Sequence, residues 1–331
     1  MQFRSIADLN RDVLAGLGTL PRDIDVVVGI PRSGMLPATL IALALNLPLA
    51  ELESFAEGRL LGVGKTRRAA STDRGFDDVN HVLVVDDSVH EGNAMRDARR
   101  RMEPLKDRFR ITYCAIYGAA RSPAVDFVFE SVPHPRVFEW NVMHHSILER
   151  ACVDIDGVLC SDPSASENDD GAAYLSFLRN ARPRFIPTHR IGELVTSRLE
   201  KYRAETEEWL AGQGVRFGRL VMLDLPSGEE RRRLGAHAEF KGNHYRGSKA
   251  ELFIESELRQ AVEIARLSGK SVLSMEGPVM CEPGSLSPLA IAERVRFRTR
   301  RLGRTALLRM LRSLLGPNAY EALKQRVRNR A

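Results

Sequence analysis

The chain has 331 residues, of which 44% are apolar and 28% charged, an ordinary composition for soluble globular protein. A single hydrophobic core rarely serves a chain of this length, so two domains are expected. The net charge of +6 has a local origin: residues 286–331 hold twelve Lys or Arg against Glu293 and Glu321, a balance of +10, so the remainder is near −4. A charge confined to one tail argues against a nucleic-acid groove on the fold.

Cysteine usage and the start of the chain indicate a cytoplasmic protein. The four cysteines form no Cys-x-x-Cys pair and have no His nearby at metal-ligand spacing, so neither a disulfide framework nor a zinc site is predicted. The first residues, MQFRSIADLN, lack the apolar core of a secretory signal. The most apolar run, Met35–Ala50, is short and interrupted by Pro37, Asn46 and Pro48, so we expect a buried helix there and no membrane span.

Short β-branched runs alternate with amphipathic segments, which predicts an α/β protein with two doubly wound domains of parallel strands. One strand series ends and another begins near His144–Glu149, so we place the domains at residues 1–147 and 148–285, followed by a basic helical tail at 286–331. The predicted strands are Asp25–Ile30, Val82–Val85, Ile111–Ile116, Phe127–Phe129, Cys152–Ile155, Leu194–Thr196, Leu220–Leu223 and Leu252–Ile254, and the predicted helices include Ala94–Met102 and Leu199–Gly212.

The run VLVVDDSVHEGNAM, at Val82–Met95, is an apolar strand that leads into two carboxylates, a glycine turn and a helix. Backbone N–H groups at such a turn, together with the N-terminus of a helix, form a nest for phosphate. Asp86 and Asp87 are placed to hold ribose hydroxyls and to stabilise cationic character at the anomeric carbon. An Asp-Asp pair after a strand is also a common βα turn with a helix cap, so the interpretation depends on further segments.

Two further segments combine glycines with basic side chains. Asp25–Met35, DVVVGIPRSGM, is a strand that ends in a turn containing Arg32, Ser33 and Gly34. Gly58–Arg68, GRLLGVGKTRR, is a basic loop punctuated by glycines. Arginine and lysine side chains on such loops neutralise a departing pyrophosphate.

In this order the three segments resemble the type I phosphoribosyltransferases. The resemblance implies a site for phosphoribosyl pyrophosphate and Mg²⁺, in which Asp86 and Asp87 hold the ribose. The binding residues that it implies are Arg32, Ser33 and Gly34, Lys65, Arg67 and Arg68 on a mobile loop, and Ser88, His90, Gly92 and Asn93 around the 5-phosphate.

The 5-phosphate loop departs from the family pattern at His90–Ala94. This segment replaces a Thr- and Gly-rich run and lacks its hydroxyls, so we expect an acceptor other than a standard nucleobase. Glu91 or His90 is a candidate general base toward an alcohol. The alternative is that both side chains are simply solvated.

The run ACVDIDGVL, at Ala151–Leu159, is a buried strand that ends in Asp-x-Asp-Gly. Side chains two residues apart on a strand point the same way, so Asp154 and Asp156 are expected to share one cleft. One carboxylate can attack phosphorus while the other gives and takes a proton, and Mg²⁺ makes the attack of an anion on an anion possible. A structural turn or a fragment of a calcium loop is the alternative.

This motif resembles the first motif of the haloacid dehalogenase superfamily, and segments like the later motifs follow in order. Lys241, in HAEFKGNHY, is the expected cation, with Lys249 as its rival. The layout of Thr196–Phe217 looks like the branch that includes polynucleotide 3′-phosphatases, and the roughly forty residues between the first two motifs leave room for a small cap at most. The site residues implied are the nucleophile Asp154, the acid and base Asp156, the phosphate ligands Thr196 and Ser197, and the metal ligands Asp154, Asp156 and Glu255.

The Arg-rich tail begins at Ser287 and has an amphipathic pattern, with Arg309 and Arg312 opposite an apolar face. Such a helix either lies on an anionic membrane leaflet or packs on the protein's own core with its basic side in solvent, and both interpretations stay open. The apolar residues are Leu302, Leu307, Met310, Leu311, Leu314 and Leu315.

Across residues 20–285 the chain resembles the dual-domain ribofuranosyltransferases of bacterial surface-polysaccharide (O-antigen) assembly. The resemblance implies transfer of 5-phosphoribose to a glycan acceptor, which is lipid-linked in one interpretation, and then removal of the 5-phosphate. It places the enzyme in the cytoplasm, with peripheral contact of the tail to the membrane as one option. The alternatives are a nucleobase phosphoribosyltransferase fused to a nucleotidase, and a regulator that senses phosphoribosyl pyrophosphate.

Overall fold

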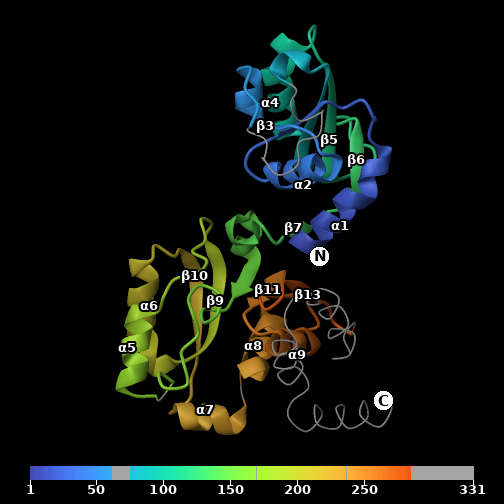
Figure 1. Ribbon diagram of the computed structural model, residues 1–331. Coiled ribbons are helices and arrows are strands. Elements are labelled where there is room, and N and C mark those ends of the chain that lie inside the picture. The colour runs from blue at the N-terminus through green and yellow to red at the C-terminus, as the bar shows by residue number, and fades with distance from the viewer. Residues whose placement is uncertain (62–74, 169, 236, 285–331) are drawn as a thin grey trace, which may run out of the picture. The chain divides into compact units, whose positions relative to one another are not determined.

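The computed structural model of the protein describes residues 1–61, 75–168, 170–235 and 237–284 (Figure 1). The predicted basic loop residues Lys65, Arg67 and Arg68 lie outside these ranges, as does the predicted tail. The chain divides into two compact units, Met1–Trp140 and Asn141–Ala331. In the described ranges, every helix is too short or too polar to cross a membrane.

The first unit contains a five-stranded parallel sheet in the order β3-β2-β4-β5-β6. Strands β1 and β7 form a separate, two-stranded parallel sheet in the same unit. The four predicted strands of this unit are confirmed as β2, β4, β5 and β6. The strands are β1 (Gln2–Arg4), β2 (Val26–Gly29), β3 (Leu49–Glu51), β4 (His81–Ser88), β5 (Arg110–Gly118), β6 (Phe127–Ser131) and β7 (Arg136–Phe138), and the helices are α1 (Ile6–Gly16), α2 (Met35–Leu45), α3 (Leu52–Ala56) and α4 (Asn93–Met102).

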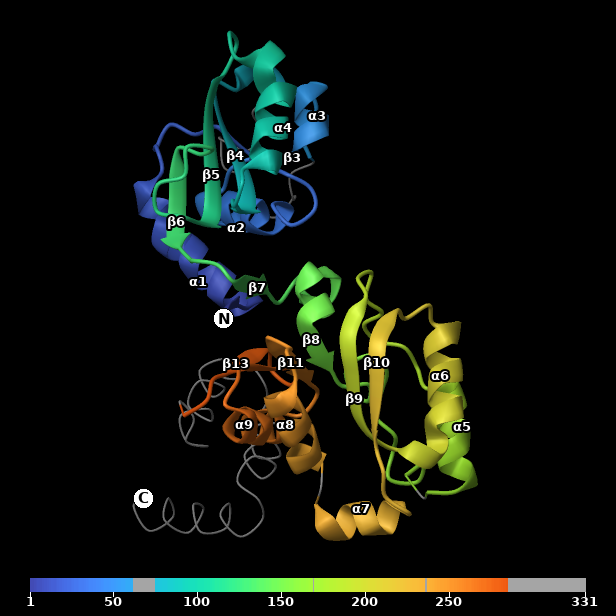
Figure 2. The ribbon, with the colours of Figure 1, turned by 180° about the vertical axis from the view of Figure 1, so that it is seen from behind.

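Both faces of this sheet are buried, which explains why its strands are continuous apolar runs. Successive residues of β2 point to opposite sides: Val26 and Val28 pack in the core beneath α3 and α4, and Val27 packs in the core beneath α1 and α2. Helices therefore cover both faces, the doubly wound arrangement that the sequence predicts (Figures 1 and 2).

The apolar run Met35–Ala50 is not a single helix. Helix α2 ends at Leu45 because Asn46 adopts the left-handed conformation (φ 54°) that closes a helix. Pro48 follows, and the last residues of the run form β3 at the edge of the sheet. The expectation of burial holds for Ala50, which is fully buried, but Leu43 stays 75% exposed.

The second unit contains a six-stranded sheet in the order β10-β9-β8-β11-β12-β13, parallel except for β13. Helices α8 and α9 pack on one side of it, and α5 and α6 pack against each other beside β9 and β10 (Figures 1 and 2). The strands are β8 (Ala151–Val153), β9 (Ile191–Leu199), β10 (Phe217–Leu223), β11 (Leu252–Glu255), β12 (Val272–Ser274) and β13 (Val279–Cys281), and the helices are α5 (Ala172–Asn180), α6 (Arg203–Gly212), α7 (Gly228–Leu234), α8 (His237–Gly247) and α9 (Leu258–Ser268).

All four strands predicted here are present as β8 to β11. The predicted helix Leu199–Gly212 begins later than expected: β9 continues through Leu199, a 3₁₀ turn covers Glu200–Tyr202, and α6 starts at Arg203. The β-branched and apolar residues before Leu199 favour the extended conformation and draw the chain into the sheet.

Candidate active sites

Asp86 and Asp87 end strand β4 at the carboxyl edge of the first sheet. Both side chains are buried, and Asp87 accepts two hydrogen bonds: 2.9 Å from Ser33 Oγ and 2.7 Å from Trp140 Nε1. The predicted pyrophosphate turn and the predicted ribose turn therefore meet at the Asp87 carboxylate. Trp140 stacks on Phe138, with ring centroids 4.7 Å apart. Its role was missed because Trp140 is 53 residues from Asp87 and belongs to no motif.

Two glycines let these turns approach each other. A Cβ atom on Gly34 would lie 2.5 Å from the Ile30 carbonyl oxygen and 2.7 Å from that of Val85, so only glycine lets the turn after β2 lie against the end of β4. Gly92 has a φ of 76°, and a Cβ there would also meet Ala124 Cβ at 2.7 Å. The turn from Asp86 to the start of α4 thus depends on glycine for its shape.

The remaining residues predicted for the ribose and phosphates lie around this turn. Arg32, His90, Glu91 and Asn93 are exposed, and Ser88 is half-buried. The Glu91 carboxylate accepts a 3.2 Å hydrogen bond from Asn93 Nδ2. The His90 ring lies against His134, with centroids 3.9 Å apart. These side chains are open to a ligand.

The pKa of Asp86 is raised to about 8, first by burial and then by the neighbouring Asp87 charge. In the unfolded chain the pKa of an Asp carboxyl is about 3.9, so the folded state binds this proton more tightly than the unfolded state does. The resulting contribution to stability is complete below about pH 4 and is lost as the pH rises through about 8. The neutral carboxyl is therefore the form that the unliganded fold favours.

We expect the free energy of unfolding of the first unit to fall by a few kcal/mol between pH 5 and pH 9, since one pKa unit corresponds to about 1.4 kcal/mol. Asp86→Asn should flatten this dependence because the amide does not ionise. Urea titrations followed by Trp140 fluorescence, in proteins that also carry Trp209→Phe, would measure the pH dependence of the free energy of unfolding with and without Asp86→Asn. Parallel pH profiles for the two proteins would contradict the assignment.

In the second unit, a cavity of about 130 Å³ opens beside Asp154, which follows β8. We call it the Asp154 pocket. Lys241 Nζ, on α8, lies 2.7 Å from Asp154 Oδ2 and 2.8 Å from Glu255 Oε2 at the end of β11, and all three side chains are buried. The residues that line the pocket are Asp154, Asp156, Asp162, Pro163, Asn168, Tyr174, Thr196, Ser197, Arg231, His237, Lys241, Ser256 and Gln260.

The predicted residues of this unit are brought together in and beside the pocket. Asp154, Asp156, Thr196, Ser197 and Lys241 line it, and Glu255 contacts it through Lys241. The rival cation, Lys249, instead lines a different cavity with Glu149 and Arg190. Lys241 is thus the lysine that contacts Asp154.

Two buried donors on the pocket wall have no hydrogen-bond partner. Arg231, on α7, is 6% exposed and uses Nη1 and Nη2 to bond the Ser197 carbonyl and Asn168, while its Nε is unpaired. Ser197 Oγ is also unpaired. Buried polar atoms are normally satisfied, so each of these two atoms needs a partner that the protein itself does not supply. Arg231 was missed because it is one of three consecutive arginines.

Burial and neighbouring carboxylates raise the pKa values of two acidic side chains at the pocket. Burial raises the pKa of Asp154 well above its usual range, and Glu255 and Asp156 add to the rise while Lys241 opposes it. The pKa of Asp162 is raised by burial and then by Asp156. A set of carboxylate oxygens in this condition fits a hard divalent cation such as Mg²⁺, whose charge would favour the ionised forms.

Asp156, which the sequence predicts as an acid, base and metal ligand, forms an ion pair with an arginine that the sequence did not predict. Arg198, whose side chain is 0% exposed, donates from Nη2 to Asp156 Oδ1 at 2.7 Å and from Nε to both carboxylate oxygens at 3.2 Å. Arg198 follows Ser197 on β9 and was missed because the sequence places it 42 residues from Asp156. It fixes the Asp156 side chain, which lines the pocket.

Arg198→Met should destabilise the second unit by about 3–5 kcal/mol, because it leaves the Asp156 carboxylate without its buried partner. The matched change Arg203→Met removes an exposed pair with Glu200 and should cost about 1 kcal/mol or less. Thermal unfolding followed by Trp209 fluorescence would compare them. Equal shifts in Tm would show that the Asp156 pair is not the structural support described here.

Comparison with known proteins identifies the first unit. Residues 4–146 match the phosphoribosyl transferase domain family. Among solved structures, the Helicobacter pylori xanthine-guanine-hypoxanthine phosphoribosyltransferase is 15% identical over 43% of this chain and 92% of that chain, with a TM-score of 0.32. The purine phosphoribosyltransferase of Pyrococcus horikoshii Ot3 is 18% identical over 42% of this chain and 92% of that chain, with a TM-score of 0.31.

A chain of a Pnkp1/Rnl/Hen1 complex is 14% identical over 79% of this chain and 97% of that chain, with a TM-score of 0.23. No curated protein matches. The family match lies within and just beyond the first unit, Met1–Trp140, and ends at residue 146. The match covers the segments that resemble the type I phosphoribosyltransferases in the first unit, and it leaves the second unit unassigned.

Proposed function

We propose that the protein transfers 5-phosphoribose from phosphoribosyl pyrophosphate to a hydroxyl of a glycan and then removes the 5-phosphate, leaving a ribofuranosyl residue. The observation that carries the proposal is that the chain has, in addition to the part that matches the phosphoribosyl transferase domain, a second unit in which buried Asp154 contacts Lys241 in a pocket that Ser197 and Arg231 also line. On this proposal the working parts are residues 1–147, a haloacid dehalogenase-type phosphatase at 148–285, and a tail at 286–331.

In the first step the bond between the anomeric carbon and pyrophosphate breaks, and a sugar hydroxyl bonds to that carbon and loses its proton. Asp86 and Asp87 stabilise the developing positive charge, and the backbone around Ser88, Gly92 and Asn93 receives the 5-phosphate. Arg32, Lys65 and Arg67 neutralise the pyrophosphate. The exposed Glu91 and His90 are the candidates to accept the proton of the acceptor.

In the second step Asp154 attacks phosphorus and the bond from phosphorus to the ribose oxygen breaks, while Asp156 gives that oxygen a proton. Water then hydrolyses the aspartyl phosphate, and Asp156 takes the proton back. Lys241, Thr196, Ser197 and Arg231 surround the phosphate. Asp154, Asp156 and Glu255 would hold Mg²⁺, whose charge would reduce the repulsion between the two anions.

The acceptor is the part of the proposal that separates it from its rivals. The phosphoribosyltransferase domain is equally compatible with a nucleobase acceptor and a nucleotidase in the second unit. The segment His90–Ala94 favours a sugar, because it lacks the hydroxyl side chains expected of a nucleobase enzyme. A helix of the basic tail on an anionic membrane would bring the protein to a lipid-linked glycan.

Purified protein should be incubated with phosphoribosyl pyrophosphate and Mg²⁺, together with a panel of nucleobases or lipid-linked glycans. We expect pyrophosphate release with a glycan and not with a nucleobase. Release with nucleobases alone would favour the salvage-type enzyme. Binding of the donor without release in any mixture would favour the regulator.

A further inference from the structure

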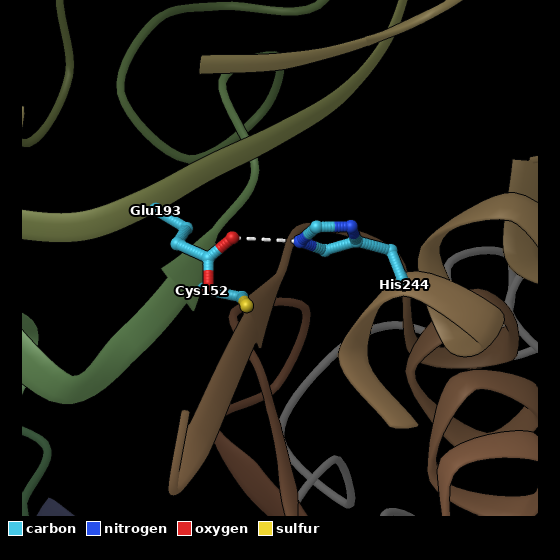
Figure 3. A group of neighbouring side chains, drawn as sticks. All are labelled: Cys152, Glu193 and His244. Atoms are coloured by element: carbon cyan, nitrogen blue, oxygen red, sulfur yellow. Dashed lines mark hydrogen bonds and ion pairs between the residues drawn. The ribbon is translucent and has the colours of Figure 1, made fainter. Parts of the chain in front are cut away.

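Three side chains from three elements of the second unit converge away from the Asp154 pocket. They are Cys152 on β8, Glu193 on β9 and His244 on α8, and their potential ligand atoms all lie within 4.8 Å of one another (Figure 3). His244 Nε2 lies 2.7 Å from Glu193 Oε2. None of the three is among the residues that line the Asp154 pocket.

This set of ligands has the chemistry of a zinc site. Thiolate and imidazole are the ligands that zinc prefers, carboxylate is its usual third type, and Zn–S, Zn–N and Zn–O distances are about 2.3, 2.0 and 2.1 Å. Ligand atoms around a tetrahedral ion are therefore a little over about 3 Å apart, so the present cluster needs only small side-chain shifts to enclose one. The ion would take the place of the hydrogen between Glu193 and His244.

We propose that Cys152, Glu193 and His244 bind a divalent cation of the zinc type, with water as its fourth ligand. The water position is supplied by a cavity of about 340 Å³ that adjoins two of the ligands. The side chains of Glu193 and His244 are 22% and 17% exposed, so an ion can reach them, whereas Cys152 closes the inner side. The cavity is lined by Glu193, Arg219, Asn243, His244, Gly247 and Ser248.

The position of the cluster gives the site a structural role. Cys152 lies two residues before Asp154, Glu193 three before Thr196, and His244 three after Lys241. One ion would therefore join the three elements that carry the nucleophile, a phosphate ligand and the buried lysine. Since metal binding to a folded site adds its free energy to folding, zinc should stabilise the second unit without taking part in phosphate chemistry.

The test uses the full chain without a polyhistidine tag, stripped with a chelator and then given Zn²⁺ or Co²⁺. We expect one equivalent of zinc to be retained on dialysis, a higher Tm with zinc, and a sulfur-to-cobalt charge-transfer band with Co²⁺. Cys152→Ala should lose the band. Cys152→Ala and His244→Gln should both lose the zinc-dependent rise in Tm.

Control variants test whether another cysteine or histidine gives rise to the cobalt band. Cys160 Sγ lies 3.4 Å from Asp156 Oδ1, so Cys160→Ala should keep the band if Cys152 is the ligand. His134→Gln disrupts the His90–His134 pair of the first unit and should also keep it. If the Cys152→Ala protein does not fold, the amount of zinc bound by the His244→Gln protein still tests the proposal, because the His244 side chain is partly exposed. If His244→Gln retains as much zinc as the unmodified protein, or if the band is lost in Cys160→Ala alone, the proposal is overturned.

Discussion

Asp154→Asn is expected to stop the protein at a phosphorylated intermediate: the acceptor receives 5-phosphoribose and keeps its phosphate. The amide cannot form the aspartyl phosphate, so dephosphorylation should fall by about 10⁶-fold, as when the nucleophile of a hydrolase is removed. Pyrophosphate release should be unchanged because it depends on the other unit. Mass spectrometry of the acceptor and a phosphate assay would measure the two steps separately.

The matched control is Asp224→Asn, an exposed aspartate of the same unit that does not line the Asp154 pocket. It should leave both steps at the level of the unmodified protein. If the Asp154→Asn protein still yields a dephosphorylated acceptor, the pocket does not perform the second step.

Asp87→Asn is expected to slow the first step strongly and with it the formation of both products. An asparagine can still accept the hydrogen bond from Trp140 and donate one to Ser33, so the turn should keep its shape while losing one negative charge. Removing one preorganised electrostatic contact to a transition state costs about 10² to 10³-fold in rate. Pyrophosphate release under saturating donor and acceptor would measure the loss.

Asp97→Asn, on the outer face of α4, removes an exposed carboxylate and its surface pair with Arg100 and serves as the control. Its rate should stay within a factor of two or so of the unmodified protein, since exposed pairs contribute about 1 kcal/mol or less. Comparable rates for Asp87→Asn and Asp97→Asn would remove Asp87 from the proposed chemistry.

Much of the fold could be predicted because its signals are local. Buried parallel strands are continuous apolar runs, which is why β2, β4 and β11 could be placed from the sequence. Strand β3 was not predicted because it continues the most apolar run in the chain. The left-handed conformation of Asn46, which separates β3 from α2, is visible only in the structure.

The sites were predictable only where each residue belongs to a local motif. Asp86 and Asp154 each end an apolar strand, and that pattern is readable along the chain. Trp140, Arg198 and Arg231 contact residues that are 34 to 63 positions away in the sequence, and nothing nearby distinguishes them from other tryptophans and arginines. Their contacts arise from tertiary packing.

The two-step account is tested most directly with phosphoribosyl pyrophosphate labelled at its 5-phosphate and a lipid-linked glycan. With the unmodified protein, labelled inorganic phosphate should appear in proportion to ribose gained by the glycan, whereas Asp154→Asn should leave the label on the glycan. Label that stays on the glycan with the unmodified protein, or that is freed as fast by the variant, would contradict the account.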